Sequence, residues 1–218
     1  MAENVIEKIN EEKIIAIVRG IEYKEILRLG EALREGGINC IEVTFDQSDG
    51  EKVKDTLKSI NLLSELGDFC VGAGTVITSE QAELAIKAGA EYIISPNVDE
   101  GVIGKTKELG KISIPGAFTA TEIETAYKLG GDIIKVFPAG LLGAEYIRAL
   151  KAPLSHIPLT AVGGINHENC GSFVAAGAVG IGVGGRLVSR EAVAEKRYDE
   201  ITLLAKEYRR NIDSIWHN

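Results

Sequence analysis

The segment Asp132-Ile133-Ile134-Lys135-Val136-Phe137-Pro138 is a short apolar run that carries a lysine near its centre. Short runs rich in isoleucine and valine are typical of strands that are covered on both faces of a parallel sheet. Charged side chains are rarely buried there unless they are paired or functional. Lys135 therefore either packs its stem and extends its head to water, or is buried for a chemical reason.

The chemical reason follows from what burial does to an amine. Burial lowers the pKa of a lysine because it disfavours the charged ammonium form. A neutral amine is a nucleophile, and it forms a Schiff base with a carbonyl substrate. Lys135 is thus a candidate for covalent catalysis on a keto compound.

Similar apolar runs recur along the whole chain and predict eight strands. These are Ile14–Val18, Cys40–Thr44, Phe69–Ala73, Tyr92–Ser95, Ile112–Ile114, Ile133–Val136, Leu159–Val162 and Val179–Val183. Amphipathic stretches between them predict helices, among them Tyr23–Glu35, Ser79–Lys87 and Thr119–Leu129, each followed by glycine. Thr119 and Glu122 have the spacing of a capping box.

Eight strands that alternate with helices predict an α/β fold, a (β/α)8 TIM barrel. The polar, helix-like stretch Met1–Lys13 adds an extra N-terminal helix. An open doubly wound sheet is the alternative. Such sheets more often have a G-x-G-x-x-G turn after the first strand, and Val18-Arg19-Gly20-Ile21 is not one.

Composition narrows the class of protein. No linker divides the 218 residues, so we expect one domain over residues 1–218. The net charge of −8 argues against a nucleic-acid partner, although a small anion needs only a local positive site. No apolar run approaches the length of a membrane span, and no signal-peptide core is present. Three widely spaced cysteines, Cys40, Cys70 and Cys170, indicate free thiols of a cytoplasmic protein.

Active sites of such barrels lie at the C-terminal ends of the strands. Strand alternation predicts that Ile41 and Val43 face the helices and Glu42 points into the barrel. By the same alternation Lys135 points inward. The two groups form either a buried structural ion pair or a nucleophile with its acid/base partner, and we favour the second. Arg19, after the first strand, binds a substrate anion or neutralises Glu42.

Glycine clusters follow the last two predicted strands. Gly163-Gly164-Ile165-Asn166 opens a helix around residues 167–175, and Gly182-Val183-Gly184-Gly185-Arg186 ends the eighth strand. Such loops bring backbone N–H groups close to an anion, and TIM barrels often bind phosphate at these two positions. One glycine pair alone is usually a turn, but two at the expected positions indicate a phosphate site.

These segments together resemble the 2-keto-3-deoxy-6-phosphogluconate and 4-hydroxy-2-oxoglutarate (KDPG/KHG) aldolases, with features of the 2-keto-3-deoxy-6-phosphogalactonate aldolases. The similar segments are Ala16-Ile17-Val18-Arg19-Gly20, Ile41-Glu42-Val43-Thr44, Val71-Gly72-Ala73-Gly74-Thr75-Val76, Ile94-Ser95-Pro96-Asn97, Ile114-Pro115-Gly116, Ile134-Lys135-Val136-Phe137-Pro138-Ala139 and Gly163-Gly164-Ile165. The resemblance implies a homotrimeric lyase that acts on pyruvate and phosphorylated keto sugar acids.

The resemblance also implies roles for individual residues. Lys135 would be the Schiff-base lysine and Glu42 the general acid/base. Thr75 and Pro96 would line the pyruvate pocket, Pro115 and Phe137 would be further substrate-binding residues, and the phosphate would be held at Gly163, Gly164, Gly184 and Gly185. No cofactor or metal is implied, and His156, His167 and His217 lack metal-ligand spacing.

Two departures from the family pattern leave parts of this assignment open. Many gluconate-type members have an arginine for the pyruvate carboxylate where this chain has Phe45-Asp46-Gln47, so Arg19 is the nearest candidate. Gluconate-type enzymes often have Pro-Thr before the Gly-Gly pair, whereas this chain has Ala161-Val162, as in the phosphogalactonate type. Val162 is therefore a candidate substrate contact near C4, where the two substrates differ.

The expected activity is retro-aldol cleavage of a 2-keto-3-deoxy-6-phospho sugar acid to pyruvate and glyceraldehyde 3-phosphate. Cleavage of 4-hydroxy-2-oxoglutarate to pyruvate and glyoxylate is a further expectation. Epimerases and isomerases that use phosphate-binding barrels without a Schiff base are an alternative class, and a non-catalytic phospho-sugar binder is another. A buried nucleophilic lysine distinguishes the aldolase from both.

Overall fold

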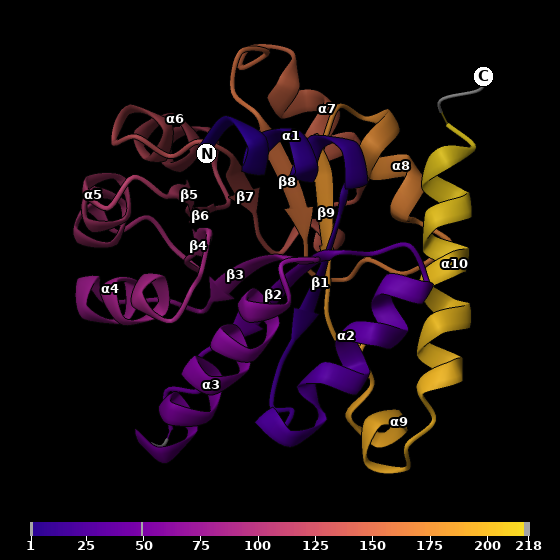
Figure 1. The fold of residues 1–218 in the computed structure, drawn as a ribbon. Helices are drawn as coiled ribbons and strands as arrows, with labels where there is room; N and C mark the ends of the chain where they lie inside the picture. Colours follow the sequence, from indigo (N-terminus) through magenta and orange to yellow (C-terminus); the bar gives the residue numbers. More distant parts are fainter. Residues whose placement is uncertain (1, 49, 216–218) are drawn as a thin grey trace.

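The computed structural model describes residues 2–48 and 50–215 as an α/β barrel. The strands found there form one parallel sheet in the order β5-β4-β3-β2-β1-β9-β8-β7-β6 (Figure 1). Their bounds are β1 Ile14–Val18, β2 Cys40–Thr44, β3 Cys70–Gly74, β4 Tyr92–Ile94, β5 Ile112–Ile114, β6 Gly116–Ala117, β7 Ile134–Val136, β8 Leu159–Val162 and β9 Gly180–Val183. The predicted TIM-barrel class, with its extra N-terminal helix, is confirmed.

The predicted fifth strand, Ile112–Ile114, is found as β5, and a short strand that was not predicted, β6, follows it directly after Pro115, so the sheet has nine strands instead of the expected eight. Proline has no backbone N–H to contribute to a ladder. On one side of it β5 pairs with β4, and on the other β6 pairs with β7. The Lys135 N–H donates to the Pro115 carbonyl at 2.9 Å, and the Asp132 N–H donates to the Ser113 carbonyl at 2.8 Å. These bonds bring the two ends of the sheet together.

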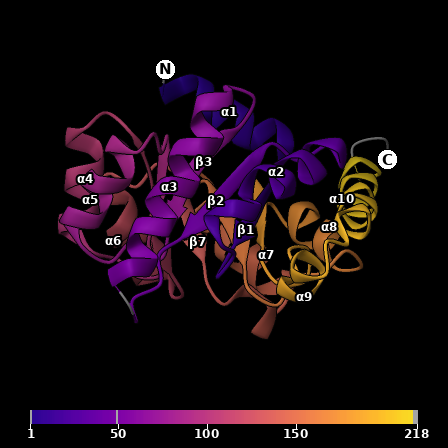
Figure 2. The same ribbon diagram turned by 60° about the horizontal axis from the view of Figure 1, so that its bottom comes forward.

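Helices surround the barrel (Figures 1 and 2). They are α1 Ala2–Glu12, α2 Ile26–Glu35, α3 Gly50–Leu66, α4 Ser79–Lys87, α5 Glu100–Glu108, α6 Ala120–Lys128, α7 Ala144–Lys151, α8 Cys170–Ala175, α9 Arg190–Ala194 and α10 Tyr198–Asp213. Two 3-10 turns, η1 Tyr23–Glu25 and η2 Ala139–Leu141, lie between them. The predicted capping box of Thr119 and Glu122 is confirmed at the start of α6. No described helix is long and apolar enough to cross a membrane.

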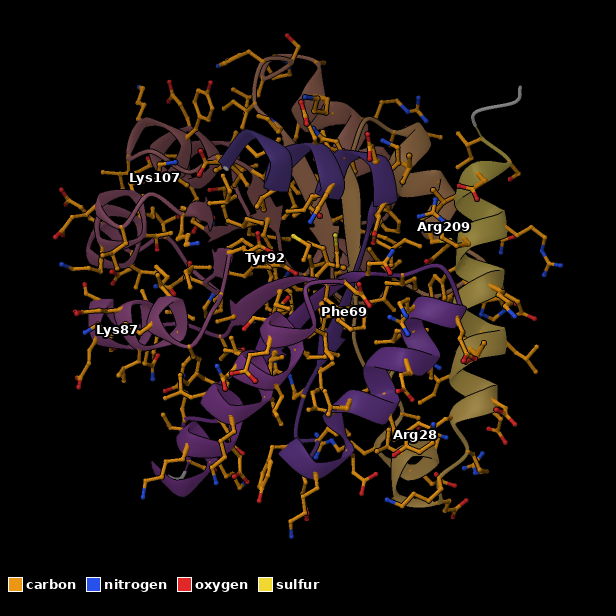
Figure 3. The ribbon with its side chains drawn as sticks, viewed as in Figure 1. Arg28, Phe69, Lys87, Tyr92, Lys107 and Arg209 are labelled. Atoms are coloured by element: carbon orange, nitrogen blue, oxygen red, sulfur yellow. The ribbon has the colours of Figure 1, made fainter. Side chains whose placement is uncertain are left out.

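Helix α1 closes the N-terminal end of the barrel. Its Val5 and Ile9 pack against inward side chains of the strands, among them Ile15, Ile112 and Ile133. The outward side chains, including Ile41, Val43, Ile134 and Val136, pack instead with the surrounding helices. The opposite, C-terminal end of the barrel is therefore the one left for a substrate. Figure 3 shows Tyr92 in the middle of the molecule, while Lys87 and Lys107 lie at its periphery.

Candidate active site

Lys135 lies inside the barrel with 6% of its surface exposed. Its strand β7 is held between β6 and β8, where its register partners are Gly116 and Thr160. The ammonium nitrogen lies 5.0 Å from the centre of the Phe137 ring. Burial lowers the pKa of Lys135 below its ordinary value, the charge of Glu42 raises it, and Arg19 lowers it further. The net effect is a lowered pKa, which increases the share of the neutral, nucleophilic amine.

Glu42 is 1% exposed and also points into the barrel, as alternation predicted. Gly74 makes room for it, since an ideal Cβ at position 74 would lie 1.7 Å from Glu42 Oε1. Burial raises the pKa of Glu42, while the charges of Lys135 and Arg19 lower it. Within the described residues neither the Glu42 side chain nor the Lys135 side chain forms a hydrogen bond or an ion pair.

Arg19 lies just beyond β1, where its side chain is exposed at the rim of the barrel. Its Nη2 donates a hydrogen bond to Thr75 Oγ1 at 3.0 Å. The charge of Arg19 lowers the pKa values of both Glu42 and Lys135. Thr75 has a φ of 56°, a left-handed conformation that a β-branched residue rarely adopts. This pair presents one positive charge and one hydroxyl beside the nucleophile.

The remaining predicted pocket residues lie on neighbouring strand ends. Pro96 follows β4 and packs over Gly116, because an ideal Cβ there would lie 2.5 Å from the Pro96 carbonyl. Pro115 is buried at the junction of β5 and β6. Val162 ends β8 and is 5% exposed, whereas Phe137 after β7 is 40% exposed. The barrel topology brings these residues to the same end as Lys135.

The two glycine loops also lie at this end, but one differs from its prediction. Gly163 and Gly164 have φ values of 91° and 76°, which glycine adopts without strain. The helix after them, α8, begins only at Cys170. The intervening turn is held by two asparagines: Asn166 Oδ1 accepts from the Asn169 N–H at 2.9 Å, and Asn169 Oδ1 accepts from the Asn166 N–H at 2.8 Å. These N–H groups already have acceptors, and the helix predicted around residues 167–175 begins three residues later, at Cys170.

Other backbone donors of the loops are free. The N–H groups of Gly164 and Gly185 have no acceptor among the described residues, and both glycines are exposed. The Gly163 carbonyl accepts from the Gly140 N–H at 2.8 Å, which fastens this loop to the turn after β7. Two fixed loops with free donors are suited to hold an anion.

Sequence reasoning did not identify three polar groups of the interior and rim. The buried hydroxyls of Tyr92 and Thr160 have no hydrogen-bond partner within the described residues. Their inward positions follow from strand alternation, which was the available signal. Gln47, quoted only as part of a departure from the family, donates to the Thr75 carbonyl at 2.7 Å.

The arrangement as a whole supplies a buried amine with a lowered pKa, a buried carboxyl group, a cation at the rim and free backbone donors. This set is suited to Schiff-base chemistry on an anionic keto compound. The described residues contain no group of three or more histidine, cysteine, aspartate or glutamate side chains placed to hold a metal ion. The three cysteines are buried and free, as expected.

Comparison with known proteins gives concordant matches. A family model described as KDPG and KHG aldolase matches residues 5–204. The 2-dehydro-3-deoxy-6-phosphogalactonate aldolase of Escherichia coli (strain K12) is 34% identical over 198 residues, 90% of this chain and 94% of that protein. The 2-dehydro-3-deoxy-phosphogluconate aldolase of Treponema pallidum (strain Nichols) is 32% identical, over 93% of this chain and 95% of that protein.

A solved structure extends the similarity to the fold. It is a KDPG aldolase from Legionella pneumophila, with pyruvate captured at low pH as a covalent carbinolamine intermediate. It superposes with a TM-score of 0.81 at 27% sequence identity, covering 94% of this chain and 97% of the other.

Proposed function

Because this chain belongs to the KDPG and KHG aldolase family, we propose that it is a class I pyruvate aldolase. It is a carbon–carbon lyase that cleaves a 2-keto-3-deoxy-6-phospho sugar acid to pyruvate and glyceraldehyde 3-phosphate. Residues 1–218 form a single barrel domain for this chemistry. The observation that carries the proposal is Lys135, an amine buried opposite a buried glutamate in a barrel of this family.

The mechanism begins with the neutral amine. Lys135 Nζ attacks the C2 ketone to give a carbinolamine. Glu42, through water, donates the proton with which the carbinolamine hydroxyl leaves as water, and a protonated imine remains. The imine accepts the electron pair of the C3–C4 bond as that bond breaks. Glu42, through water, removes the proton of the C4 hydroxyl, and glyceraldehyde 3-phosphate leaves. The enamine is then protonated at C3, and water releases pyruvate from Lys135.

The other residues bind the substrate. Arg19 and the Thr75 hydroxyl hold the carboxylate, and Pro96, Pro115 and Phe137 enclose the pyruvyl part. The free N–H groups of the loops at Gly163-Gly164 and Gly184-Gly185 hold the phosphate. The same pocket without phosphate contacts accepts 4-hydroxy-2-oxoglutarate, which gives pyruvate and glyoxylate.

The experiment that tests this function is a cleavage assay on the purified chain. The phosphogluconate and phosphogalactonate epimers are supplied side by side, and released pyruvate is measured. Wild type should cleave at least one, while Lys135→Ala and Lys135→Arg should be inactive, the second because a guanidinium stays protonated. Turnover of both epimers by Lys135→Ala would contradict the proposal.

The choice of epimer rests on Val162. This side chain is buried at the end of β8 against Gly182, and it offers shape but no hydrogen bond near C4. A site that bonds a hydroxyl discriminates far better than an apolar one. Wild type therefore discriminates poorly or prefers the galactonate epimer, and Val162→Thr should favour the gluconate epimer by about 1 kcal/mol. An unchanged ratio of kcat/KM values would place the choice elsewhere.

The proposal also covers the oligomeric state of the protein and its location in the cell. The protein is a cytoplasmic homotrimer, as the family resemblance implies. Leu141 and Leu142, 77% and 50% exposed, supply apolar surface of the kind that subunit contacts cover. Sedimentation equilibrium should give three times the chain mass, and a monomer at micromolar concentration would contradict the trimer.

A further inference from the structure

The chain has two glutamines, Gln47 and Gln81, and they lie side chain to side chain at the rim of the barrel. Gln47 follows β2, and Gln81 lies in the first turn of α4. Gln81 Nε2 donates to Gln47 Oε1 at 2.8 Å, and Gln47 Nε2 contacts Gln81 Oε1 at 3.5 Å. The two amides therefore face each other as a reciprocal pair.

The backbone between them fixes the orientation of both amides. The Thr75 carbonyl can only accept, and Gln47 Nε2 donates to it at 2.7 Å. The Ile77 N–H can only donate, and Gln81 Oε1 accepts from it at 3.0 Å. The remaining oxygen of Gln47 and the remaining donor of Gln81 then meet each other. Every bond of this cluster agrees with the donor and acceptor chemistry of an amide.

The segment to which the two glutamines bond, residues 75–77, contains a strained residue. Thr75 has a φ of 56°, and a β-branched residue is held there only where surrounding contacts determine the conformation. The Gln47 bond to its carbonyl is such a contact. The Thr75 hydroxyl accepts a hydrogen bond from Arg19 Nη2 at 3.0 Å. A chain of bonds thus runs from the glutamine pair to the cation at the active-site rim.

We propose that Gln47 is a positioning residue, which holds Thr75 in its left-handed conformation so that Thr75 and Arg19 together bind the carboxylate of the keto acid. The inference rests on the proposed function and adds a part to it. Gln81 donates a hydrogen bond to Gln47. It also accepts one from the Ile77 N–H at the start of α4, beside the capping residue Thr78, so its structural role there is sufficient to explain it. Among the described residues Gln47 makes no bond that caps a helix.

The test measures how much pyruvate is needed to saturate the Schiff base. Wild type, Gln47→Met and Thr75→Val are reduced with borohydride over a range of pyruvate concentrations, and the adduct is counted by mass. Gln47→Met fills the same space without a donor. It should raise the half-saturating concentration about tenfold, the loss expected for one net hydrogen bond, with the same maximal adduct. Glu80→Gln, exposed on the same turn of α4, should match wild type.

Two further arms separate positioning from general damage. Methyl pyruvate carries no carboxylate charge, so its half-saturating concentration should be nearly the same in wild type and Gln47→Met. In a Thr75→Val background the effect of Gln47→Met should disappear, because Gln47 acts through the position of the Thr75 hydroxyl, which that variant lacks. Equal losses for both ketones, or additive losses in the double variant, would overturn the inference and leave the aldolase function intact. A wild type that forms no adduct would instead overturn the function itself.

Discussion

Glu42 and Gly74 occupy adjacent strands so closely that a methyl group at position 74 would lie 1.7 Å from Glu42 Oε1. The absent side chain is therefore what allows a carboxyl group to lie buried in the barrel. The acid/base role of Glu42 therefore depends on position 74, although the residue there has no functional side chain.

The first prediction concerns Glu42 itself. Glu42→Gln should fold normally and reduce kcat by about 10²–10⁴-fold, the usual cost of a lost general acid/base. Steady-state cleavage kinetics with circular dichroism as the folding control provide the measurement. Activity within a few-fold of wild type would assign the proton transfer to another group.

A second prediction uses Gly74. Gly74→Ala should displace the Glu42 carboxyl group, because the new methyl would overlap it. We expect kcat to fall toward that of Glu42→Gln although Glu42 is still present. The double variant should be no worse than Glu42→Gln alone, since both changes act through one group. Additive losses would mean that position 74 matters for another reason.

The charges around Lys135 give a signed pH prediction. Burial lowers the pKa of Lys135, Glu42 raises it and Arg19 lowers it. Glu42→Gln should therefore lower this pKa further, and Arg19→Met should raise it. The measurement is the pH at which acetic anhydride labels half of Lys135, read from peptide masses. Midpoints that move in the same direction in both variants would refute this charge arrangement.

Gly185 offers a selective probe of phosphate binding. A Cβ at Gly185 would meet nothing within 4 Å, so Gly185→Val should fold. It would fill space beside a free N–H group and should reduce kcat/KM for the phosphorylated substrate about 10–100-fold, the equivalent of one charge-assisted hydrogen bond. Turnover of 4-hydroxy-2-oxoglutarate, which has no phosphate, should change little. A similar loss on both substrates would show that the loop is structural.

The interior makes a prediction about stability as well. The Tyr92 hydroxyl is buried without a partner among the described residues, beneath α1. An unpaired buried polar group costs about 1–3 kcal/mol, so Tyr92→Phe should raise the free energy of unfolding by about 1 kcal/mol. Chemical denaturation measures it, and Tyr208→Phe, which removes a second unpaired hydroxyl, is a parallel case. Destabilisation by Tyr92→Phe would indicate a partner such as buried water.

Much of the site followed from strand alternation. The period of two in Cys40–Thr44 and Ile133–Val136 placed Glu42 and Lys135 in the interior, and the structure puts both there. The start of α6 could also be predicted from the sequence, because the capping signal of Thr119 and Glu122 is local.

Features that depend on contacts between distant residues could not be predicted from the sequence. Nothing local predicts a left-handed Thr75, because its conformation is held by Gln47 from another loop. The start of α8 was misplaced because side chains of Asn166 and Asn169 take up the N–H groups of the turn. The short strand β6 after Pro115 was not predicted, because its two residues are defined as a strand only by their pairing with β7.

The most direct test of the account is to trap the covalent intermediate. Wild-type protein incubated with pyruvate and borohydride should gain one reduced pyruvate adduct per chain, and peptide mapping should place it on Lys135. Lys135→Arg, treated in the same way, should gain none. An adduct on a different lysine, or none on a fully folded wild type, would contradict the Schiff-base mechanism.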